Sequence, residues 1–505
     1  MHPRNIYQDT ISFAKLAKDY PDFAKCLKGR NSIDFHDPEA VRQLAKALLK
    51  RDFNLDVDLP EDRLCPAIPN RLNYILWLND LITDTHGYMT TPESNKVVGV
   101  DIGTGASAIY PLLGCSHFPH WQFITTDIDS TSLSNATRNI QQNSLDGRVT
   151  IVDVSASPTI FPPEVTENSL TIDFAMCNPP FYTSINDMLS SAKLKSVPPL
   201  SACTGSTTEM VTEGGEVSFV GRMVDESLKL REKIRWYTSM LGKLGSVEKI
   251  VDKLKQNGVS NYVVGEFVQG VGKTKRWAVG WSFSDQRAGD HLSRQPTSHS
   301  LKVHLPFPTT FRVPLPMDTT LSSFLPRVEE LLKTSCSEFP TDTFEWTSVR
   351  LPYFTTMYGT IENLYSNGKG ETNGNTWSRA ARRKRKQLEA LEGEGQGSST
   401  TSSEPKFGFA VGIFIDATIQ PAETAQKVRP KTGEANDVED NEIGDEADAW
   451  DHDFISLPKS SVEPETNKGS FVLLRWTRGV DQVLWESFCG MLRRKILDGL
   501  VKPKD

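Results

Sequence analysis

The feature that most constrains the fold is an apolar, β-branched run from Val97 to Ile102 that breaks at glycines and resumes as a helical pattern. The helical pattern carries apolar residues at Ile109, Leu112 and Leu113. A strand, a glycine turn and a helix in this order form the opening unit of a parallel α/β sheet. We therefore expect an α/β, Rossmann-like domain built around this unit.

Three more apolar runs follow and predict further strands at 121–126, 149–154 and 170–177. The first of these ends at Asp127, and the last delivers the chain directly to Asn178. Ligands of open α/β sheets bind outside the carboxyl ends of the strands. Both residues are therefore candidates for a functional site.

The remaining elements of this domain are predicted with less regular spacing. We expect a Ser-, Thr-, Gly- and Pro-rich loop at 182–216 and a helix from Val217 through Ile234. An apolar run at 236–241 follows, then a second helix at 246–257 and two strands at 261–269 and 276–284.

A chain of 505 residues is too long for a single core, because cores stop growing near 250 to 300 residues. We predict three parts of the chain: a basic helical N-terminal arm at 1–35, the Rossmann-like α/β domain at 36–290 and a smaller α+β domain at 298–505. The smaller domain is expected to contain two disordered insertions of low complexity, at 366–405 and 421–468.

The net charge of −8 argues against a nucleic-acid partner only at first sight. Eight acidic residues and no Lys or Arg fall between Glu434 and Asp453, so the rest of the chain is close to neutral. The seven cysteines form no CxxC pair, which favours buried thiols over a metal site. No apolar run is long enough to span a bilayer, and the N-terminus lacks the apolar stretch of a secretory signal.

The glycine turn itself predicts a nucleotide-containing cofactor. Asp101, Gly103 and Gly105 stand at the strand end, where glycines let a ligand approach the backbone. A dinucleotide site of the G-x-G-x-x-G kind is the alternative, but Ala108 occupies the third glycine position. A tight turn without a ligand is the other alternative.

Asp127 ends the second strand, where a carboxylate can accept hydrogen bonds from both ribose hydroxyls of a bound nucleoside. A lone Asp in this place is otherwise an ordinary helix cap, and Asp129 competes with Asp127 for that role. We assign the ribose to Asp127.

The tetrapeptide Asn178-Pro179-Pro180-Phe181 is the most specific motif, because it follows a buried strand. An aromatic amine is a poor nucleophile, so a site that methylates it must localise the nitrogen lone pair. The Asn178 side-chain oxygen and the Pro179 carbonyl can accept the two amine hydrogens, and the prolines hold these acceptors in place. Phe181 can stack on the aromatic ring that carries the amine. The alternative is that the tetrapeptide forms a rigid turn without catalytic function.

Basic residues mark two possible contacts with RNA. The N-terminal arm carries Arg4, Lys15, Lys18, Lys28 and Arg30 among apolar residues at helical spacing. A second cluster extends from Arg379 to Lys386 within the low-complexity region; it predicts a nuclear localisation signal or an RNA contact, with a solvated helix face as the alternative. We expect a nuclear protein, with the cytoplasm as a further location.

Several stretches together resemble one family, the methyltransferase-like protein 16 adenosine-N6 methyltransferases of U6 spliceosomal RNA, and the chain is similar to a fungal member. The stretches are Tyr20 to Phe23, Asp37 to Arg42, Pro69 to Tyr74, Asp101 to Ser107, Asn178 to Phe181, Glu213 to Glu216, Arg235 to Tyr237 and Arg276 to Ala278. They occur in the family's order and cover residues 1 to about 285.

The resemblance implies a class I methyltransferase fold with S-adenosyl-L-methionine as cofactor. It implies that Arg71 holds the cofactor's carboxylate, that Gly103 and Ser107 line the cofactor, and that Asp127 holds its ribose where many relatives have Glu. It implies that Asn178 also lies at the cofactor and that Arg276 contacts RNA. The family's C-terminal domain binds RNA, and only its architecture is carried over to 298–505.

The resulting hypothesis is an RNA methyltransferase that acts on the exocyclic amine of an adenosine in structured RNA, with U6 small nuclear RNA as the first substrate. No metal and no membrane are expected to take part. Two alternatives remain open: a protein glutamine N5-methyltransferase, whose loop typically ends in Tyr rather than Phe181, and an RNA-binding protein without catalytic activity.

Overall fold

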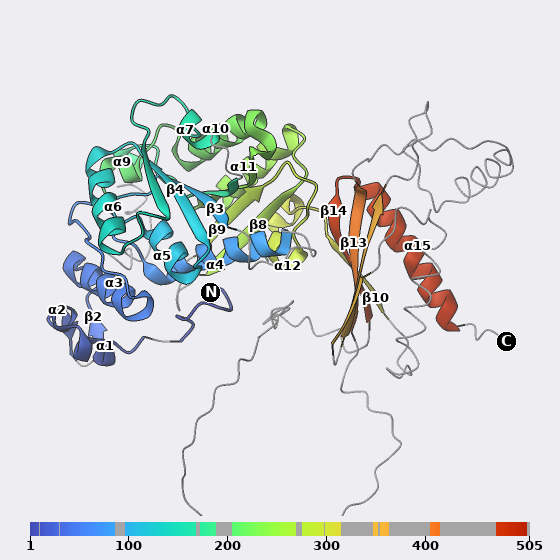
Figure 1. Cartoon of the computed structure of the whole chain (residues 1–505), viewed down its shortest axis with the longest axis horizontal. Coiled ribbons are helices and arrows are strands. Elements are labelled where there is room, and N and C mark those ends of the chain that lie inside the picture. The colour runs from blue at the N-terminus through green and yellow to red at the C-terminus, as the bar shows by residue number, and fades with distance from the viewer. Residues whose placement is uncertain are drawn as a thin grey trace, which may run out of the picture.

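The chain is described here by a computed structural model. The described residues are 1–9, 11–29, 31–85, 96–167, 172–187, 205–268, 275–296, 298–314, 347–351, 354–362, 405–414 and 471–501. They form a large α/β unit and a smaller β-rich unit, shown in Figure 1. No helix in this part of the chain is both long and apolar enough to cross a membrane.

The large unit is built on a mixed sheet of seven strands in the order β5-β4-β3-β6-β7-β9-β8. Its strands are β3 (Val97–Ile102), β4 (Trp121–Asp127), β5 (Val149–Asp153), β6 (Ile172–Cys177), β7 (Ile234–Leu241), β8 (Tyr262–Val268) and β9 (Lys275–Trp281). The first five are parallel, and β9 runs antiparallel to both β7 and β8. The predicted Rossmann-like class I methyltransferase fold is thus confirmed.

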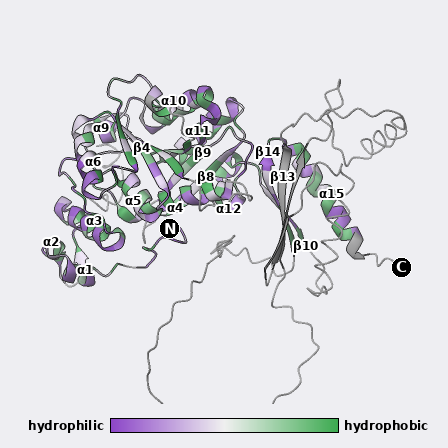
Figure 2. Cartoon of the chain, in the orientation of Figure 1, coloured by the Kyte–Doolittle hydropathy of each residue, from purple (hydrophilic) through white to green (hydrophobic). Residues whose placement is uncertain are grey.

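Helices cover both faces of this sheet, so its central strands are apolar on both sides. Phe174 and Met176 of β6 face a core shared with one group of helices, whereas Ala175 and Cys177 face the core on the other side. The first group is α3 (Pro38–Phe53), α4 (Ile68–Thr85), α5 (Ile109–His117) and α6 (Ser130–Gln142); the second is α10 (Gly215–Leu230) and α11 (Leu244–Gln256). Figure 2 shows hydrophobic residues along the strands and on the helices that cover them.

Individual residues explain one helix start and one close contact between strands. Asp37 caps α3 by accepting the backbone N–H of Glu39, with Pro38 at the first helical position. The close contact of two central strands depends on Gly99, because a Cβ there would lie 2.3 Å from the Cζ atom of Phe174. Glycine therefore makes room for a large ring between adjacent strands.

The N-terminal arm is packed on the α/β unit. It consists of α1 (Phe13–Asp19), α2 (Pro21–Ala24) and a short hairpin of β1 (Leu27–Lys28) and β2 (Ser32–Ile33). Leu16 and Phe23 are each only 1% exposed, so this segment buries an apolar side while its lysines face outward.

The helix predicted from Val217 through Ile234 is too long. The α-helix ends at Leu230, and Arg231 adopts a positive φ of 47° that stops it. A short 3-10 turn follows, and Ile234 then begins β7. The apolar run after it pairs with two neighbouring strands, and this long-range pairing outweighs the local helical pattern.

The smaller unit contains an antiparallel sheet of five strands in the order β10-β14-β13-β12-β11 and a long helix. Its elements are β10 (Thr310–Pro314), β11 (Thr347–Leu351), β12 (Phe354–Glu362), β13 (Pro405–Phe414), β14 (Phe471–Gly479) and α15 (Gln482–Val501). The predicted insertion at 421–468 and nearly all of that at 366–405 lie outside the described residues. The domain limits themselves stay predictions.

The two units contact each other through β14 and the segment that follows β9. The backbone N–H of Arg287 donates to the carbonyl of Thr477 at 2.8 Å, and that of Gly479 donates to Asp285 at 2.7 Å. The Arg287 guanidinium lies 3.9 Å above the ring of Trp476. The two units are therefore joined by paired backbone and a stacked cation as well as by the chain.

Candidate active site

The carboxyl ends of three adjacent strands bring the predicted site residues together. Ile102, at the end of β3, pairs with Thr126 of β4 on one side and with Cys177 of β6 on the other. Asp127 and Asn178 directly follow these two partners in sequence. The convergence predicted from strand order is thus confirmed.

The glycine turn after β3 has the geometry that its residues predict. Gly103 and Gly105 have positive φ values of 70° and 66°, which residues with a Cβ rarely adopt. A Cβ on Gly103 would meet no atom within 4 Å, so the backbone faces open space. Ser107, farther along the turn, is buried. The turn therefore presents bare backbone to a ligand.

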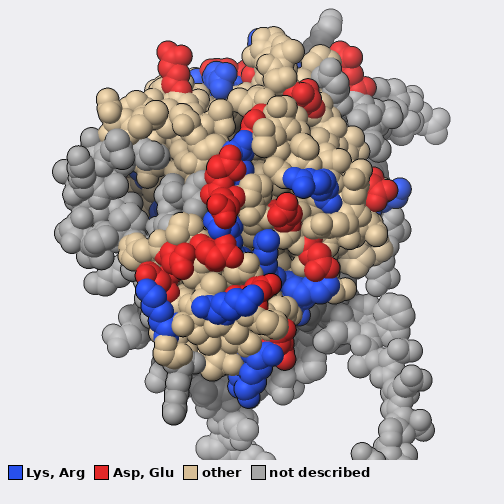
Figure 3. Space-filling model, turned by 90° about the vertical axis from the view of Figure 1, so that its left-hand side faces the viewer, with Lys and Arg blue, Asp and Glu red and all other residues tan. Residues whose placement is uncertain are grey.

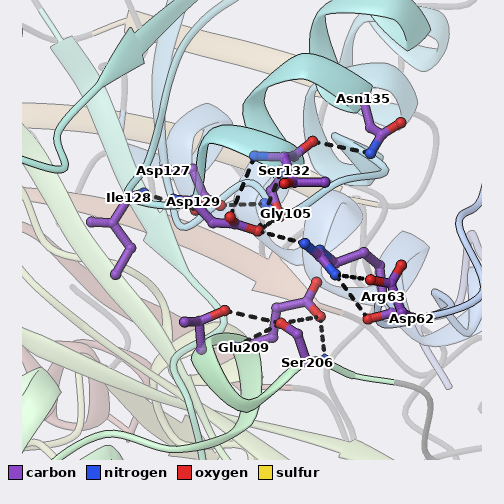
Figure 4. Close-up of polar contacts among 12 residues, drawn as sticks. Asp62, Arg63, Gly105, Asp127, Ile128, Asp129, Ser132, Asn135, Ser206 and Glu209 are labelled. Atoms are coloured by element: carbon purple, nitrogen blue, oxygen red, sulfur yellow. Dashed lines mark hydrogen bonds and ion pairs between the residues drawn. The ribbon is translucent and has the colours of Figure 1, made fainter.

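Asp127 and Asp129 have different roles in the structure. Asp129 caps α6 by accepting the backbone N–H groups of Thr131 and Ser132. Asp127 instead accepts the N–H of Gly105 at 2.8 Å and those of the two residues that follow it. Burial raises the pKa of Asp127, although these backbone donors oppose the shift. The capping role thus belongs to Asp129, and Asp127 is tied to the glycine turn (Figure 4).

Asp101 is a buried carboxylate without a well-formed hydrogen bond on either oxygen. Burial is the main cause that raises its pKa to about 7. The nearby Thr104 hydroxyl and Arg71 lower the pKa, and the Asp127 carboxylate raises it further. The Thr104 hydroxyl is itself buried without a partner at hydrogen-bond geometry. These unpartnered polar atoms lie beside the open glycine turn.

Arg71 projects from α4 and is held against Tyr110 of α5. Its Nη1 donates to the Tyr110 hydroxyl at 2.9 Å, and its guanidinium carbon lies 5.5 Å from the centre of that ring. The Nε atom of Arg71 is buried and has no partner. Burial raises the pKa of Tyr110 to about 12, so its hydroxyl stays protonated. A guanidinium in this setting can bind a carboxylate.

The Asn-Pro-Pro-Phe loop presents one free acceptor. The Oδ1 atom of Asn178 is buried and has no hydrogen-bond partner. Pro179 is buried as well, so the backbone behind this acceptor is packed. The chain after the loop is held in place because the N–H of Tyr182 donates to Met210 and its carbonyl accepts from Thr212, both at 3.0 Å. A buried acceptor without a donor fits an incoming amine.

Phe181 lies between residues that are distant in sequence. The guanidinium carbon of Arg276, on β9, is 5.9 Å from the centre of the Phe181 ring. Burial lowers the pKa of Arg276, with nearby Glu216 opposing and Arg71 adding to the shift. A Cβ on Gly242, just after β7, would lie 3.0 Å from the Phe181 ring. Arg276, predicted to contact RNA, thus lies beside the Asn-Pro-Pro-Phe loop.

Several residues of the site were not predicted from the sequence. They are Tyr110, which contacts Arg71; Arg63, which pairs with Asp129; and two carboxylates, Glu209 and Glu216, that accept backbone N–H groups. The sequence marks Glu216 only as part of the stretch Glu213 to Glu216, with no role assigned; the further signal is an acidic residue among the buried positions of α10. The others depend on contacts between distant segments.

The predicted RNA-binding arm carries exposed lysines, but its charges are mixed. Lys28 pairs with Asp34, and Arg4 pairs with Asp80. Figure 3, a view from the side of α2 and α6, shows acidic and basic side chains interspersed on this face. Lys15 and Lys18 are exposed, and Arg30 lies outside the described residues. The RNA contacts of the arm stay a prediction.

The donor set of the site fits a nucleoside cofactor with a charged amino-acid end. Open backbone at Gly103, the carboxylate of Asp127 and the unpartnered atoms of Asp101 and Arg71 supply the polar groups that such a molecule requires. Across the described residues, no three His, Cys, Asp or Glu side chains gather as ligands for a metal ion.

Comparisons with known proteins cover most of the α/β unit and, in one case, the whole chain. The human RNA N(6)-adenosine-methyltransferase METTL16 is 41% identical over 321 residues, which are 62% of this chain and 55% of the human protein. The Schizosaccharomyces pombe U6 small nuclear RNA (adenine-(43)-N(6))-methyltransferase is 44% identical over 54% of this chain and 68% of that protein. The Danio rerio METTL16 protein is 33% identical over 100% of this chain and 98% of its own length.

A solved structure and a family model agree with these relatives. The crystal structure of the human METTL16 catalytic domain in complex with the MAT2A 3′UTR hairpin 1 matches 56% of this chain and 96% of that chain, with 41% sequence identity and a TM-score of 0.51. A family model described as RNA methyltransferase matches residues 1–285, more than half of the chain. The resemblance seen in the sequence is thus confirmed, and the chain belongs to the RNA methyltransferase family.

Proposed function

We propose that the chain transfers the methyl group of S-adenosyl-L-methionine to the N6 amine of an adenosine in structured RNA. The observation that carries this proposal is the buried, unpartnered Oδ1 atom of Asn178 at the end of β6, next to Phe181. A free acceptor beside an aromatic ring matches the amine and the flat face of adenine.

The cofactor supplies an electrophilic methyl group on a sulfonium, and the protein supplies binding and orientation. Arg71 would hold the carboxylate of its methionine part, and Asp127 would accept from its ribose hydroxyls. Gly103 and Gly105 would let it approach the backbone. The Arg71 side chain is already oriented by Tyr110, which lowers the ordering cost of binding.

The protein's task on the acceptor side is to localise the nitrogen lone pair. Asn178 Oδ1 and the carbonyl of Pro179 would accept the two amine hydrogens, which turns the lone pair away from the ring. As the new N–C bond forms and the methyl–sulfur bond breaks, the nitrogen becomes positively charged and acidic. Its proton then leaves to these acceptors or to water, so no general base with a shifted pKa is required.

The substrate part of the proposal rests on the relatives. The names of the human and Schizosaccharomyces pombe proteins specify N6-adenosine methylation, of U6 small nuclear RNA in the second case, and the solved human complex contains an RNA hairpin. We therefore propose U6 small nuclear RNA as the first substrate to test. We also propose a nuclear location, supported by the basic cluster from Arg379 to Lys386, which lies outside the described residues.

The test offers radiolabelled S-adenosylmethionine and a U6 transcript to the purified full-length chain and analyses the RNA as nucleosides. We expect label in N6-methyladenosine, and none with Asn178→Ala, whose affinity for the cofactor measured by calorimetry should fall far less than that of Arg71→Ala. Label in protein glutamine, or in another nucleoside, would refute the assignment of the acceptor. Full turnover by Asn178→Ala would refute the mechanism.

A further inference from the structure

The segment from Ser206 to Glu216 lies between the cofactor side and the base side of the proposed site. It contains α9 (Thr207–Met210), with Ser206 as its N-cap, and the first turn of α10. One end of this segment is bonded to the chain before α4, and the other to the end of β7. Two carboxylates, Glu209 and Glu216, make these bonds.

Glu209 ties three parts of the cofactor side together. Its Oε2 atom accepts the N–H of Leu64 at 3.0 Å and the N–H of Ser206 at 2.8 Å. Its Oε1 atom lies 3.5 Å from the point that a Cβ of Gly105 would occupy. Glu209 thus lies beside the glycine turn and is hydrogen-bonded to the segment that precedes α4, the helix that carries Arg71.

The segment that Glu209 binds is anchored again on its other side. Arg63 donates to Asp129 at 3.0 Å and also pairs with Asp62. Figure 4 shows Arg63 reaching toward Asp129, the cap of α6, close to Ser206 and Glu209. The chain at residues 62–64 is therefore held between α6 and α9 beside the Asp127 carboxylate.

On the base side, the same segment holds the catalytic loop. Met210 and Thr212 exchange backbone hydrogen bonds with Tyr182, the residue after Phe181. A Cβ on Gly215, which has a φ of 65°, would lie 3.5 Å from the Phe181 carbonyl. The backbone of this segment therefore packs closely against the loop.

Glu216 holds the backbone that lies against Phe181. It is 2% exposed, and its Oε2 and Oε1 atoms accept the N–H groups of Gly242 at 2.7 Å and Lys243 at 3.1 Å. A Cβ added at Gly242 would lie 3.0 Å from the Phe181 ring, so this backbone lies directly against the ring. Glu216 therefore sets the position of the backbone on which the Phe181 ring rests.

We propose that the segment Ser206–Glu216 is a clasp in which two positioning residues act on different ligands: Glu209 shapes the cofactor pocket, and Glu216 positions Phe181 for the acceptor base. This proposal rests on the proposed function for the identity of the two ligands. Neither carboxylate touches the reacting atoms. Each acts through backbone that would contact a ligand, namely the Gly105 turn or the catalytic loop.

The two carboxylates differ in how many of their oxygens accept backbone hydrogen bonds. The hydrogen bonds that Glu209 accepts from Leu64 and Ser206 all end on one oxygen, Oε2, so the single oxygen of a glutamine can accept them instead. Glu216 uses both oxygens, each for a different backbone N–H, so a glutamine would place an amide NH2 against one of those donors. Substitution by glutamine is therefore expected to be mild at Glu209 and severe at Glu216.

The cofactor half is tested by calorimetry of S-adenosylhomocysteine binding to the full-length chain, without RNA. Glu209→Ala should raise the dissociation constant roughly tenfold, because it leaves the partly buried backbone N–H of Leu64 without an acceptor. Glu209→Gln should stay within about threefold of the wild type. If Glu209→Ala does not fold, Glu209→Asp, which is one methylene shorter, should show the same direction of change.

Ser206→Ala is the matched control, because it removes the capping hydroxyl of α9 and leaves the contact of Glu209 with Leu64 in place. Its dissociation constant should stay close to the wild-type value. An increase equal to that of Glu209→Ala would assign the effect to the helix cap and overturn the cofactor half of the proposal. Unchanged affinity in Glu209→Ala would overturn it as well.

The base half is tested with Glu216→Gln under saturating cofactor. We expect kcat for RNA methylation to fall roughly tenfold, with cofactor affinity within about twofold of the wild type. A matching loss of cofactor affinity would overturn the division of roles between the two residues. If the wild-type chain transfers no methyl group to RNA, the proposed function fails, whereas the cofactor titrations of Glu209 still decide their half of the clasp.

Discussion

Replacing Asp101 by Asn should stabilise the cofactor-free protein, and more so as the pH rises. Asp101 is 0% exposed and lacks a well-formed hydrogen bond, and burial raises its pKa from 3.8 to about 7. The folded chain therefore binds a proton at this site that the unfolded chain has lost between these two pH values. Since the folded state binds more protons there, its free energy of unfolding decreases as the pH rises through that window.

The size of the effect follows from the two pKa values. The pKa of Asp101 is about three higher in the folded chain than in the unfolded chain. Above pH 7 this difference lowers the free energy of unfolding by about 4 kcal/mol, which is the upper limit for a fully buried group. Asn has nearly the same shape and cannot ionise, so Asp101→Asn should escape this loss. The variant should gain little near pH 4 and most near pH 8.

The assay is urea unfolding followed by tryptophan fluorescence at pH 5, 6.5 and 8, without cofactor. Asp153→Asn is the control, because this carboxylate also ends a strand of the sheet but is exposed. Its difference from the wild type should not increase with pH. Saturating cofactor should favour the wild type, because Asp101 then has a ligand to bind. A stability difference for Asp101→Asn that is the same at every pH would refute the reasoning.

Three further predictions concern other parts of the chain. Arg71→Lys should weaken cofactor binding about tenfold by calorimetry, because an ammonium lacks the planar fork of a guanidinium; unchanged affinity would remove Arg71 from the site. Lys15→Glu combined with Lys18→Glu should lower RNA affinity on the order of tenfold at low salt and flatten its salt dependence in filter binding, and an unchanged slope would leave the arm a packing element. Arg475→Ala should destabilise the protein by about 3 kcal/mol in urea unfolding, because the Asp84 side chain is only 13% exposed and loses its ion pair. Adding Asp84→Asn to Arg475→Ala should recover part of this loss, and no recovery would contradict the pairing.

Much of the α/β unit could be predicted because its signals are local. The β-branched run at 97–102, the glycines after it and the Asp37 cap all act within a few residues of themselves. Strand order then places Asp127 and Asn178 at one edge of the sheet, because parallel strands share their direction. The helix that was predicted to reach Ile234 failed for the converse reason, since β7 depends on partners distant in sequence.

The sequence by itself determined the strand–glycine–helix unit, the order of the motifs and the chemistry of Asn178-Pro179-Pro180-Phe181, because propensity, capping and turn geometry depend on neighbouring residues. Only the tertiary structure decided which side chains meet at the site. Tyr110 orients Arg71, Arg276 lies over Phe181, and Glu216 holds Gly242 across 26 positions of chain. These contacts join helices and strands that packing brings together, and the composition of any one segment carries no record of its distant neighbours.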